Sequence, residues 1–334
     1  MGMKGSLAWR SAAAAMFLCL AGAGQGADGD KDEAKEKPPP EWLKEVTLLK
    51  PGKEPQLKPC RVRYSLSWNH LIDAGEASIV MKDESARSDS SVQVLGGEAT
   101  ARSSGLARLL WAYDCELKSQ VDKTSFRPLW FEHSETENSE TVSYRTDFKA
   151  DRVVTMRYET EPDTGEVKSK KRTFKYAHVY DLLSSILCLR SLPLKEGKTI
   201  TGVIQPFDAP YLVSFEVQGR ETREYQGKDL DTIRLGVKIQ KINKDLTLKE
   251  YKKLKTGTLW VSEDEYRLPL EIRADIFIGY VAATLVERDF LTKAEMNGEA
   301  AKIPPAKSGL KTLISNPAAI TRRLWLNRPS KQRR

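Results

Sequence analysis

Hydrophobic and polar residues alternate along the chain from residue 60 onward. In the segment CRVRYSLSW at 60–68, Val62, Tyr64, Leu66 and Trp68 fall on one face, and every residue between them is Arg or Ser. A period of two places successive side chains on opposite faces of an extended chain. The pattern predicts a β-strand with one buried face and one face in water.

Similar segments follow at short spacing, and turn-forming residues separate them. They are not separated by helices, which favours an antiparallel sheet over a parallel, doubly wound one. Roughly a dozen strands would not stay in one flat sheet. We therefore predict a mainly β fold, in which an antiparallel sheet curls into a barrel or half-barrel. The segments are 76–82, 91–97, 113–122, 127–135, 141–148, 152–160, 167–176, 198–207, 211–221, 231–242, 256–263, 266–275 and 279–290.

Two stretches break the alternation. Residues 103–112 predict a short helical segment. In a second stretch apolar residues recur three and four positions apart, as on a helix. Asp181 is placed to cap this helix by accepting from the backbone NH near Ser184, and Pro193 with Gly197 ends it. Because the helix is apolar nearly all round, we expect it to be buried centrally, against the concave face of the sheet. Its apolar positions are Val179, Leu182, Leu183, Ile186 and Leu189.

The two ends of the chain differ from this central part. Residues 1–27 have the basic, apolar and small-residue regions of a signal peptide, so we expect export to the periplasm or cell envelope. Residues 28–58, rich in charge and proline, predict a linker with a short helix around 41–49. Residues 291–334 form a basic tail with ten Lys or Arg against two acids, which equals the +8 charge of the whole chain. The domain at 60–290 is therefore nearly neutral, which argues against nucleic-acid binding.

Motifs of catalytic or metal-binding chemistry do not occur in the sequence. His70, His133 and His178 lie in separate segments without ligand spacing, and we interpret them as surface or strand-end residues. The acidic run at 263–265 is typical of a hairpin tip in water, since the glycine of a calcium loop is missing. Three cysteines follow the signal peptide and allow at most one disulfide. We predict that the protein is not an enzyme and has no cofactor or metal site.

Several weak motifs occur in a distinctive order along the domain. They are Ser119-x-x-Asp122, Pro128, Asp147-Phe148, Asp181-x-x-Ser184, Arg190-x-x-Pro193-Leu194-x-x-Gly197, Trp260-Val261-Ser262-x-Asp264, Arg267-x-Pro269 and Gly279. Together they resemble the exported bacterial family DUF3108 over about residues 60–290. The resemblance implies an exported, mostly antiparallel β protein of the cell envelope. It implies no function and no catalytic residues, because the family is named for lacking a known function.

Large apolar side chains are candidates for a ligand site. If the central helix does not fill the curled sheet, side chains on the inner side would line a dry pocket for a lipid or another apolar small molecule. The alternative is that they pack against the helix and leave no room, since protein interiors are close-packed. The candidate residues are Trp68, Trp111, Trp130, Leu183, Ile186 and Trp260.

The basic tail is a second candidate binding element. Its cations and apolar residues could lie on an anionic membrane or another acidic envelope polymer. The alternative is a disordered tail that keeps the protein soluble. The tail residues proposed for this contact are Arg322, Arg323, Trp325 and Arg328.

These observations lead to three functional hypotheses. The first is a non-enzymatic envelope protein that binds an apolar or lipid-like ligand, or a partner in the envelope. The second is a solid β scaffold that acts through its basic tail. The third is an uncharacterised hydrolase whose site is assembled from residues far apart in the sequence.

Overall fold

The computed structural model describes residues 39–54, 59–84, 93–161, 164–250, 256–276 and 278–292. The predicted signal peptide and the four tail residues proposed for surface contact lie outside these ranges. Within the described residues, no helix is long and apolar enough to cross a membrane. These residues form one mixed β-sheet of 16 strands, so the prediction of a mainly β fold is confirmed.

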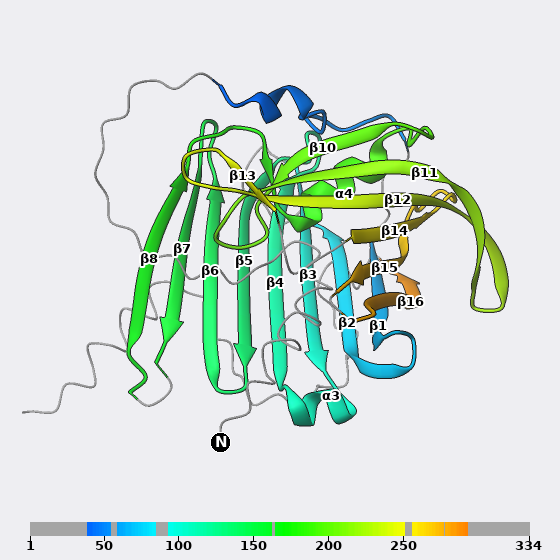
Figure 1. Cartoon of the computed structure of the whole chain (residues 1–334), viewed down its shortest axis with the longest axis horizontal. Coiled ribbons are helices and arrows are strands. Elements are labelled where there is room, and N and C mark those ends of the chain that lie inside the picture. Colours follow the sequence, from blue (N-terminus) through cyan, green and yellow to red (C-terminus); the bar gives the residue numbers. More distant parts are fainter. Residues whose placement is uncertain are drawn as a thin grey trace, which may run out of the picture. The chain divides into compact units, whose positions relative to one another are not determined.

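The first half of the sheet is a meander. Each strand pairs antiparallel with the next strand along the chain, and Figure 1 shows these strands side by side. Antiparallel neighbours need only a short connection, and the chain from β3 to β4 includes a short helix. The strands are β1 (Cys60–Trp68), β2 (Ile72–Asp83), β3 (Val94–Ser103), β4 (Tyr113–Asp122), β5 (Pro128–Glu137), β6 (Glu140–Phe148), β7 (Val153–Thr160) and β8 (Val167–Phe174).

The second half is joined to the first because the last strand pairs antiparallel with β1. Its strands are β9 (Val179–Tyr180), β10 (Thr199–Ile204), β11 (Tyr211–Tyr225), β12 (Lys228–Ile242), β13 (Leu248–Glu250), β14 (Thr256–Ser262), β15 (Pro269–Asp275) and β16 (Tyr280–Phe290). The order is β8-β7-β6-β5-β4-β3-β2-β1-β16-β15-β14-β12-β11-β10-β9, with β13 on β12. In Figure 1, β10, β11 and β12 run across the strands of the first half.

The prediction of a purely antiparallel sheet is wrong, because β9 and β10 pair in parallel. Of the two predicted shapes, barrel and half-barrel, the closed barrel is excluded, because β8 and β9 stand at the two ends of the strand order and are not paired with each other. Residues 175–178 connect these two strands, and the helix at 182–191 follows β9.

Burial alternates along the strands with the same period of two. Tyr113, Cys115, Leu117, Ser119 and Val121 of β4 are all buried, whereas the residues between them are exposed or half-buried. We call the side of β1–β8 that carries these residues the inner face. Apolar clusters cover this face and contact the second half of the sheet.

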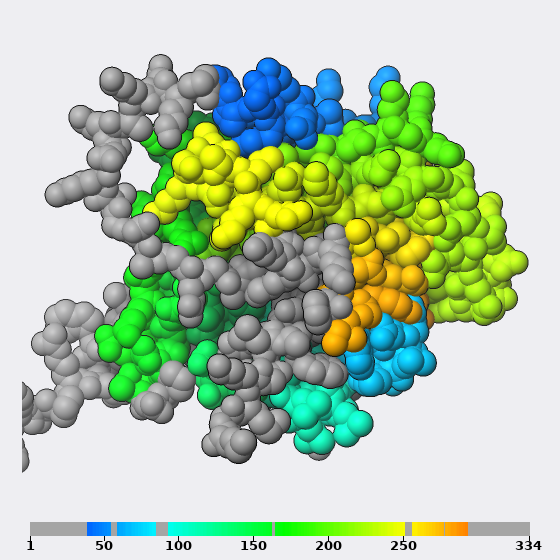
Figure 2. All heavy atoms as spheres, in the orientation of Figure 1, coloured from blue at the N-terminus to red at the C-terminus, as the bar shows by residue number. Residues whose placement is uncertain are grey.

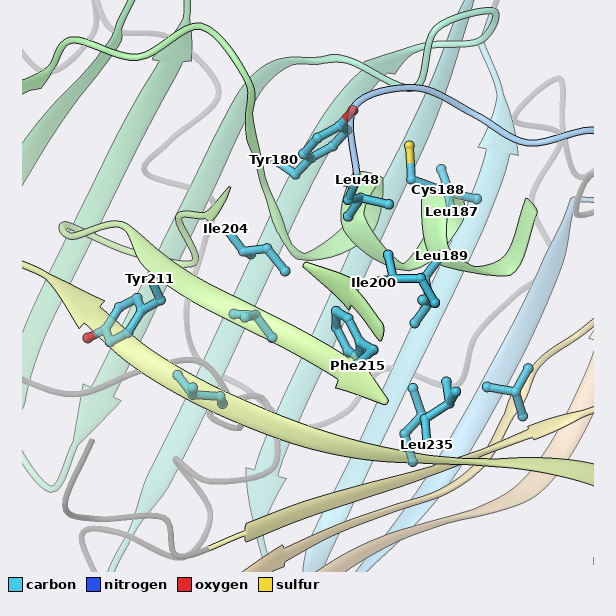
Figure 3. Close-up of a cluster of buried hydrophobic side chains, with 14 of the residues drawn as sticks. Leu48, Tyr180, Leu187, Cys188, Leu189, Ile200, Ile204, Tyr211, Phe215 and Leu235 are labelled. Carbon is cyan, nitrogen blue, oxygen red and sulfur yellow. The ribbon is translucent and has the colours of Figure 1, made fainter. Parts of the chain in front are cut away.

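The helix α4 (Leu182–Ser191) packs on the inner face. Asp181 and Ser184 form a capping box, in which the Asp181 carboxylate accepts from the Ser184 backbone NH at 2.7 Å. Leu187, Cys188 and Leu189 are buried in one cluster with residues of β4, β6, β11, β12 and β14. Figure 3 shows these side chains between the strands of the two halves. The helix therefore fills the space where the two halves of the sheet cross.

A clamp of two arginines fixes the end of α4. The Arg190 Nε donates to the Arg267 carbonyl oxygen, and an Arg267 guanidinium NH donates back to the Arg190 carbonyl oxygen at 3.2 Å. Arg267 also donates to the Leu192 carbonyl oxygen. These bonds satisfy carbonyl groups that a helix end leaves without partners. The clamp thus ties α4 to the turn between β14 and β15.

Part of the predicted linker packs against the domain. Residues 41–45 form a 3-10 helix, η1 (Glu41–Glu45), within the stretch where a short helix was expected. Trp42, Val46 and Leu48 are buried, and the backbone NH groups of Thr47 and Leu48 both donate to the Thr201 carbonyl oxygen of β10. Residues 39–54 consequently behave as an extra layer over β10.

The three cysteines are buried as free thiols. Cys60 and Cys115 belong to one apolar cluster and Cys188 to another, and the structure has no disulfide among them. Burial raises the pKa of Cys60 to about 11, so its thiol stays protonated near neutral pH. We interpret all three as apolar packing residues.

Candidate functional site

The six predicted pocket residues are not gathered in one place. Leu183 and Ile186 of α4 are half-buried at the margin of the cluster that contains Leu189. Trp68 and Trp111 lie with a second cluster on β1–β5, β15 and β16. The Trp111 ring stacks on Tyr113 at a centroid distance of 4.6 Å. The structure therefore separates these four residues into two apolar clusters.

The other two tryptophans pack under arginines. The Arg145 guanidinium lies 4.5 Å from the centre of the Trp130 ring. Trp260 lies between Arg223 and Arg273, at 4.3 and 5.0 Å from its centre. Trp130 is next to the buried Phe131, so alternation turns it to the face opposite the inner face. Through such cation–π contacts the arginines cover the rings, and Trp260 is buried whereas Trp130 is half-buried.

A cluster of buried polar side chains lies instead on the inner face of β5, β6 and β7. His133 of β5 is only 1% exposed, and its ring stacks on Tyr144 of β6. The loop at 205–210 covers this place, and all six of its residues are buried. The Phe207 ring of this loop lies 4.2 Å from the His133 ring. The three rings contact one another, since the Tyr144 and Phe207 ring centres are also only 6.0 Å apart.

The same loop supplies an amide to the cluster. Gln205 donates through Nε2 to the Thr155 hydroxyl at 2.6 Å, and Thr155 shares a hydrogen bond of 3.0 Å with Thr146. Tyr144 and Thr146 are successive inward residues of β6, so this amide lies one row of the sheet from His133. We call His133, Tyr144, Thr155, Gln205 and Phe207, together with Arg157, the polar cluster.

Several polar atoms of the cluster lack hydrogen-bond partners. Both ring nitrogens of His133, the Gln205 Oε1 and the Arg157 Nε are buried without a protein partner. Arg157 of β7 pairs with Tyr144 in the same row of the sheet as His133, and its guanidinium lies 5.9 Å from the centre of the Tyr144 ring. Buried polar groups almost always have a partner, which is water or a ligand where the protein supplies none. These atoms can therefore form hydrogen bonds with water or with a ligand.

The His133 ring is uncharged near neutral pH, and the neighbouring Glu135 is partly protonated there. Burial lowers the pKa of His133 from its ordinary 6.5 to about 3. Burial also raises the pKa of the neighbouring Glu135 from 4.5 to about 7, although the hydrogen bond from the Tyr113 hydroxyl works against this rise. Charged groups lie at the rim, where Arg172 pairs with Asp208. A molecule beside His133 would thus meet a neutral imidazole and the neutral Gln205 amide, whereas Arg157 adds a charged donor.

These shifts predict opposite pH dependences for two variants. The lowered pKa of His133 means that its contribution to stability is lost as the pH falls from 6.5 towards 3. The raised pKa of Glu135 means that its contribution is lost as the pH rises from 4.5 to 7. In the variant Glu135→Gln, stability should therefore rise with pH between 4.5 and 6.5 relative to the wild type. In the variant His133→Phe, stability relative to the wild type should fall as the pH rises over the same range.

Urea unfolding at several pH values measures both slopes as differences from the wild-type curve. The opposite signs are the decisive feature, because other titrating groups affect all three proteins alike. Equal pH dependence of the wild type and both variants would show that neither group is shifted.

The interpretation of His133 as a surface or strand-end residue is wrong. Its side chain is among the most buried that the structure describes. The available signal was the period of two, since His133 lies two residues after the apolar Phe131. His70 and His178 also lie two residues after an aromatic residue, but they fall outside the strands and lie near the surface. Within the described residues, no group of three or more His, Cys, Asp or Glu side chains could hold a metal ion.

Comparison with known proteins identifies one family and three solved structures of low similarity. The family model DUF3108, "Protein of unknown function (DUF3108)", matches residues 63–286. No curated protein matches the chain. A beta-barrel-like protein of family DUF1849 from Brucella abortus has a TM-score of 0.44 at 10% identity, covering 71% of this chain and 99% of its own.

Two further solved structures are similar over comparable lengths. A candidate exported protein with a YmcC-like fold from Bacteroides fragilis has a TM-score of 0.31 at 6% identity. A candidate lipoprotein from Parabacteroides distasonis has a TM-score of 0.30 at 9% identity. Each comparison covers 72% of this chain and 99% of the other chain.

Proposed function

The chain belongs to the DUF3108 family, and we propose that it is an exported, non-enzymatic protein of the cell envelope that binds a lipid-like ligand. The ligand lies on the inner face of the sheet, with its polar group in the polar cluster and its apolar part beside α4. The observation that carries this proposal is the gathering of unpartnered buried polar atoms around His133.

The polar part of the ligand is supported by the chemistry of the cluster. A neutral imidazole has one donor and one acceptor, and the Gln205 Oε1 adds an acceptor. A buried polar atom without a partner costs about 1–3 kcal/mol, so a ligand that supplies partners recovers this cost on binding. Hydroxyl, ester or amide groups, which donate or accept without carrying charge, fit these positions.

The apolar part is supported by the surroundings of the cluster. Tyr144 and Phe207, which contact His133, belong to the same apolar cluster as the core of α4. Leu183 and Ile186 of α4 and Val142 of β6 pack at the margin of this cluster and are only half-buried. Their remaining exposed surface favours contact with an acyl chain or another apolar group.

A binding role agrees better with His133 than a catalytic one. A histidine that acts as a general base needs a group that orients one ring nitrogen. Neither ring nitrogen of His133 has such a partner, and burial lowers its pKa to about 3. The ring is therefore a poor proton acceptor and a suitable neutral hydrogen-bonding group.

The test is organic extraction of the purified mature protein followed by mass spectrometry. We expect the wild type to release a lipid-like molecule in stoichiometric amount. His133→Phe should release none, because it removes both nitrogens, yet its free energy of unfolding should exceed that of the ligand-free wild type by about 1 kcal/mol. The matched variant His178→Phe, at an exposed site, should release as much as the wild type. Equal release from both variants would contradict the proposal.

One observation favours a solid scaffold as the second candidate. Cys188 and Leu189 of α4 are fully buried, so the centre of the sheet is packed. In that case the basic tail would be the binding element, and deletion of residues 318–334 would abolish association with the envelope. Under the ligand proposal the same deletion leaves extraction of the bound molecule unchanged.

A further inference from the structure

The most exposed apolar side chains lie on three turns. Leu71, Leu106, Leu109, Leu110 and Ile278 are between 65% and 84% exposed. No other large apolar side chain that the structure describes exceeds 44%. Single exposed leucines are common on protein surfaces, but a group of them indicates an interaction site.

The three turns lie at the same end of the sheet. Leu71 is in the turn between β1 and β2, and Ile278 is in the turn between β15 and β16. The two turns are joined, because Trp68 Nε1 donates to the Ile278 carbonyl oxygen at 3.1 Å and the Tyr280 NH donates to Asn69 Oδ1 at 2.8 Å.

The three leucines between β3 and β4 belong to the helix α3 (Gly105–Leu110). This helix is held at the start of β2 by a hydrogen bond of 3.1 Å from the Ser104 NH to the Ala74 carbonyl oxygen. Figure 1 shows α3 beside the turn from β1 to β2, and Figure 2 shows its side chains protruding at the edge of the molecule. We call the five exposed residues on these turns the aliphatic tips.

We propose that the aliphatic tips insert into the surface of a lipid bilayer with a zwitterionic head group. This surface is separate from the ligand site, and it gives the protein a fixed orientation on a membrane. Insertion removes Leu and Ile side chains from water, which is the main favourable term for proteins that lie in a membrane interface.

The composition of the tips favours lipid over a protein partner. The tips are purely aliphatic, whereas the residues that dominate protein interfaces are Trp, Tyr and Arg, with Leu under-represented. Aromatic residues stand behind the tips, as they do at membrane interfaces. Trp68 ends β1 and Tyr280 begins β16, and both are half-buried.

The charges around the tips complement a zwitterionic surface. Arg108 of α3 pairs with Asp114 at 2.8 Å, and Arg102 of β3 pairs with Glu76. Paired charges neither require anionic lipid nor repel a neutral one. Binding through the tips should consequently be driven by apolar contact and should resist salt.

Co-sedimentation of the mature, full-length protein with phosphatidylcholine vesicles in about 0.5 M salt tests this proposal, since such salt screens contacts by the basic tail. The triple variant L106S/L109S/L110S should lower partitioning at least about 100-fold. The double variant V286S/F290S changes apolar residues that are also exposed but lie elsewhere, and it should partition like the wild type. Circular dichroism verifies that each variant is folded.

Two further measurements separate the competing outcomes. His133→Phe should bind vesicles like the wild type, because the tips act independently of the ligand site. Sedimentation velocity without lipid should give the same molecular mass for the wild type and the triple variant. Equal vesicle binding by these two proteins would overturn the proposal. So would a dimer that only the wild type forms, which would make a second copy the occupant of the tips.

Discussion

Replacing Asp264 by alanine is expected to lower the free energy of unfolding by about 3 kcal/mol. The Asp264 carboxylate accepts from the Ser262 hydroxyl at 2.7 Å, from the Arg267 NH at 3.1 Å and from Arg288 at 2.9 Å. The variant leaves these donors without their acceptor. It also loosens Arg267, which clamps the end of α4. Equilibrium urea unfolding gives the difference.

The neighbouring acid provides a matched control. Glu263 pairs with Arg220 at the surface, where such a pair contributes little to stability. Glu263→Ala should therefore change the free energy of unfolding by less than about 0.5 kcal/mol. If the two substitutions cost the same, Asp264 is only another surface acid and does not organise the turn.

Leu189→Ala is expected to cost about 3 kcal/mol, because Leu189 is fully buried where α4 meets both halves of the sheet. Loss of a buried leucine side chain removes transfer free energy and leaves a cavity. The same substitution at Leu109, which is exposed on α3, should cost less than about 0.5 kcal/mol. The two unfolding curves are compared directly, and similar losses would mean that α4 is not packed in the core.

The alternating pattern was sufficient to locate most strands. β1 has the predicted bounds, since its large apolar and polar residues alternate without interruption. β3 was expected to end at residue 97 but continues to Ser103. Its last inward residues include Ala101, which is too small to give a clear signal. The period of two is therefore visible in the sequence where the inward side chains are large. Where an inward residue is small, the strand leaves no clear pattern.

The start and the end of α4 differ in how well they could be predicted. The capping box is local, so Asp181 and Ser184 were identified from their spacing. The clamp joins residues 77 positions apart in the chain, and only the fold brings Arg190 to Arg267. Asp264 was interpreted as part of a turn in water for the same reason, since its partner Arg288 lies on another strand.

The candidate site was the least predictable part. The prediction relied on residue type and chose tryptophans, but Trp130 and Trp260 pack under arginines. Which face of a strand is the inner one depends on the loop at 205–210 and on α4, which come much later in the chain. His133 could have been identified from the sequence only if Phe131 was already known to point inward.

A crystal structure of the mature protein, purified without detergent, tests the central claim most directly. We expect electron density for one bound molecule whose polar group contacts the His133 ring and the Gln205 Oε1 and whose apolar part runs towards Leu183. Separate water molecules as the sole partners of these atoms, with no other density on the inner face, would contradict the account.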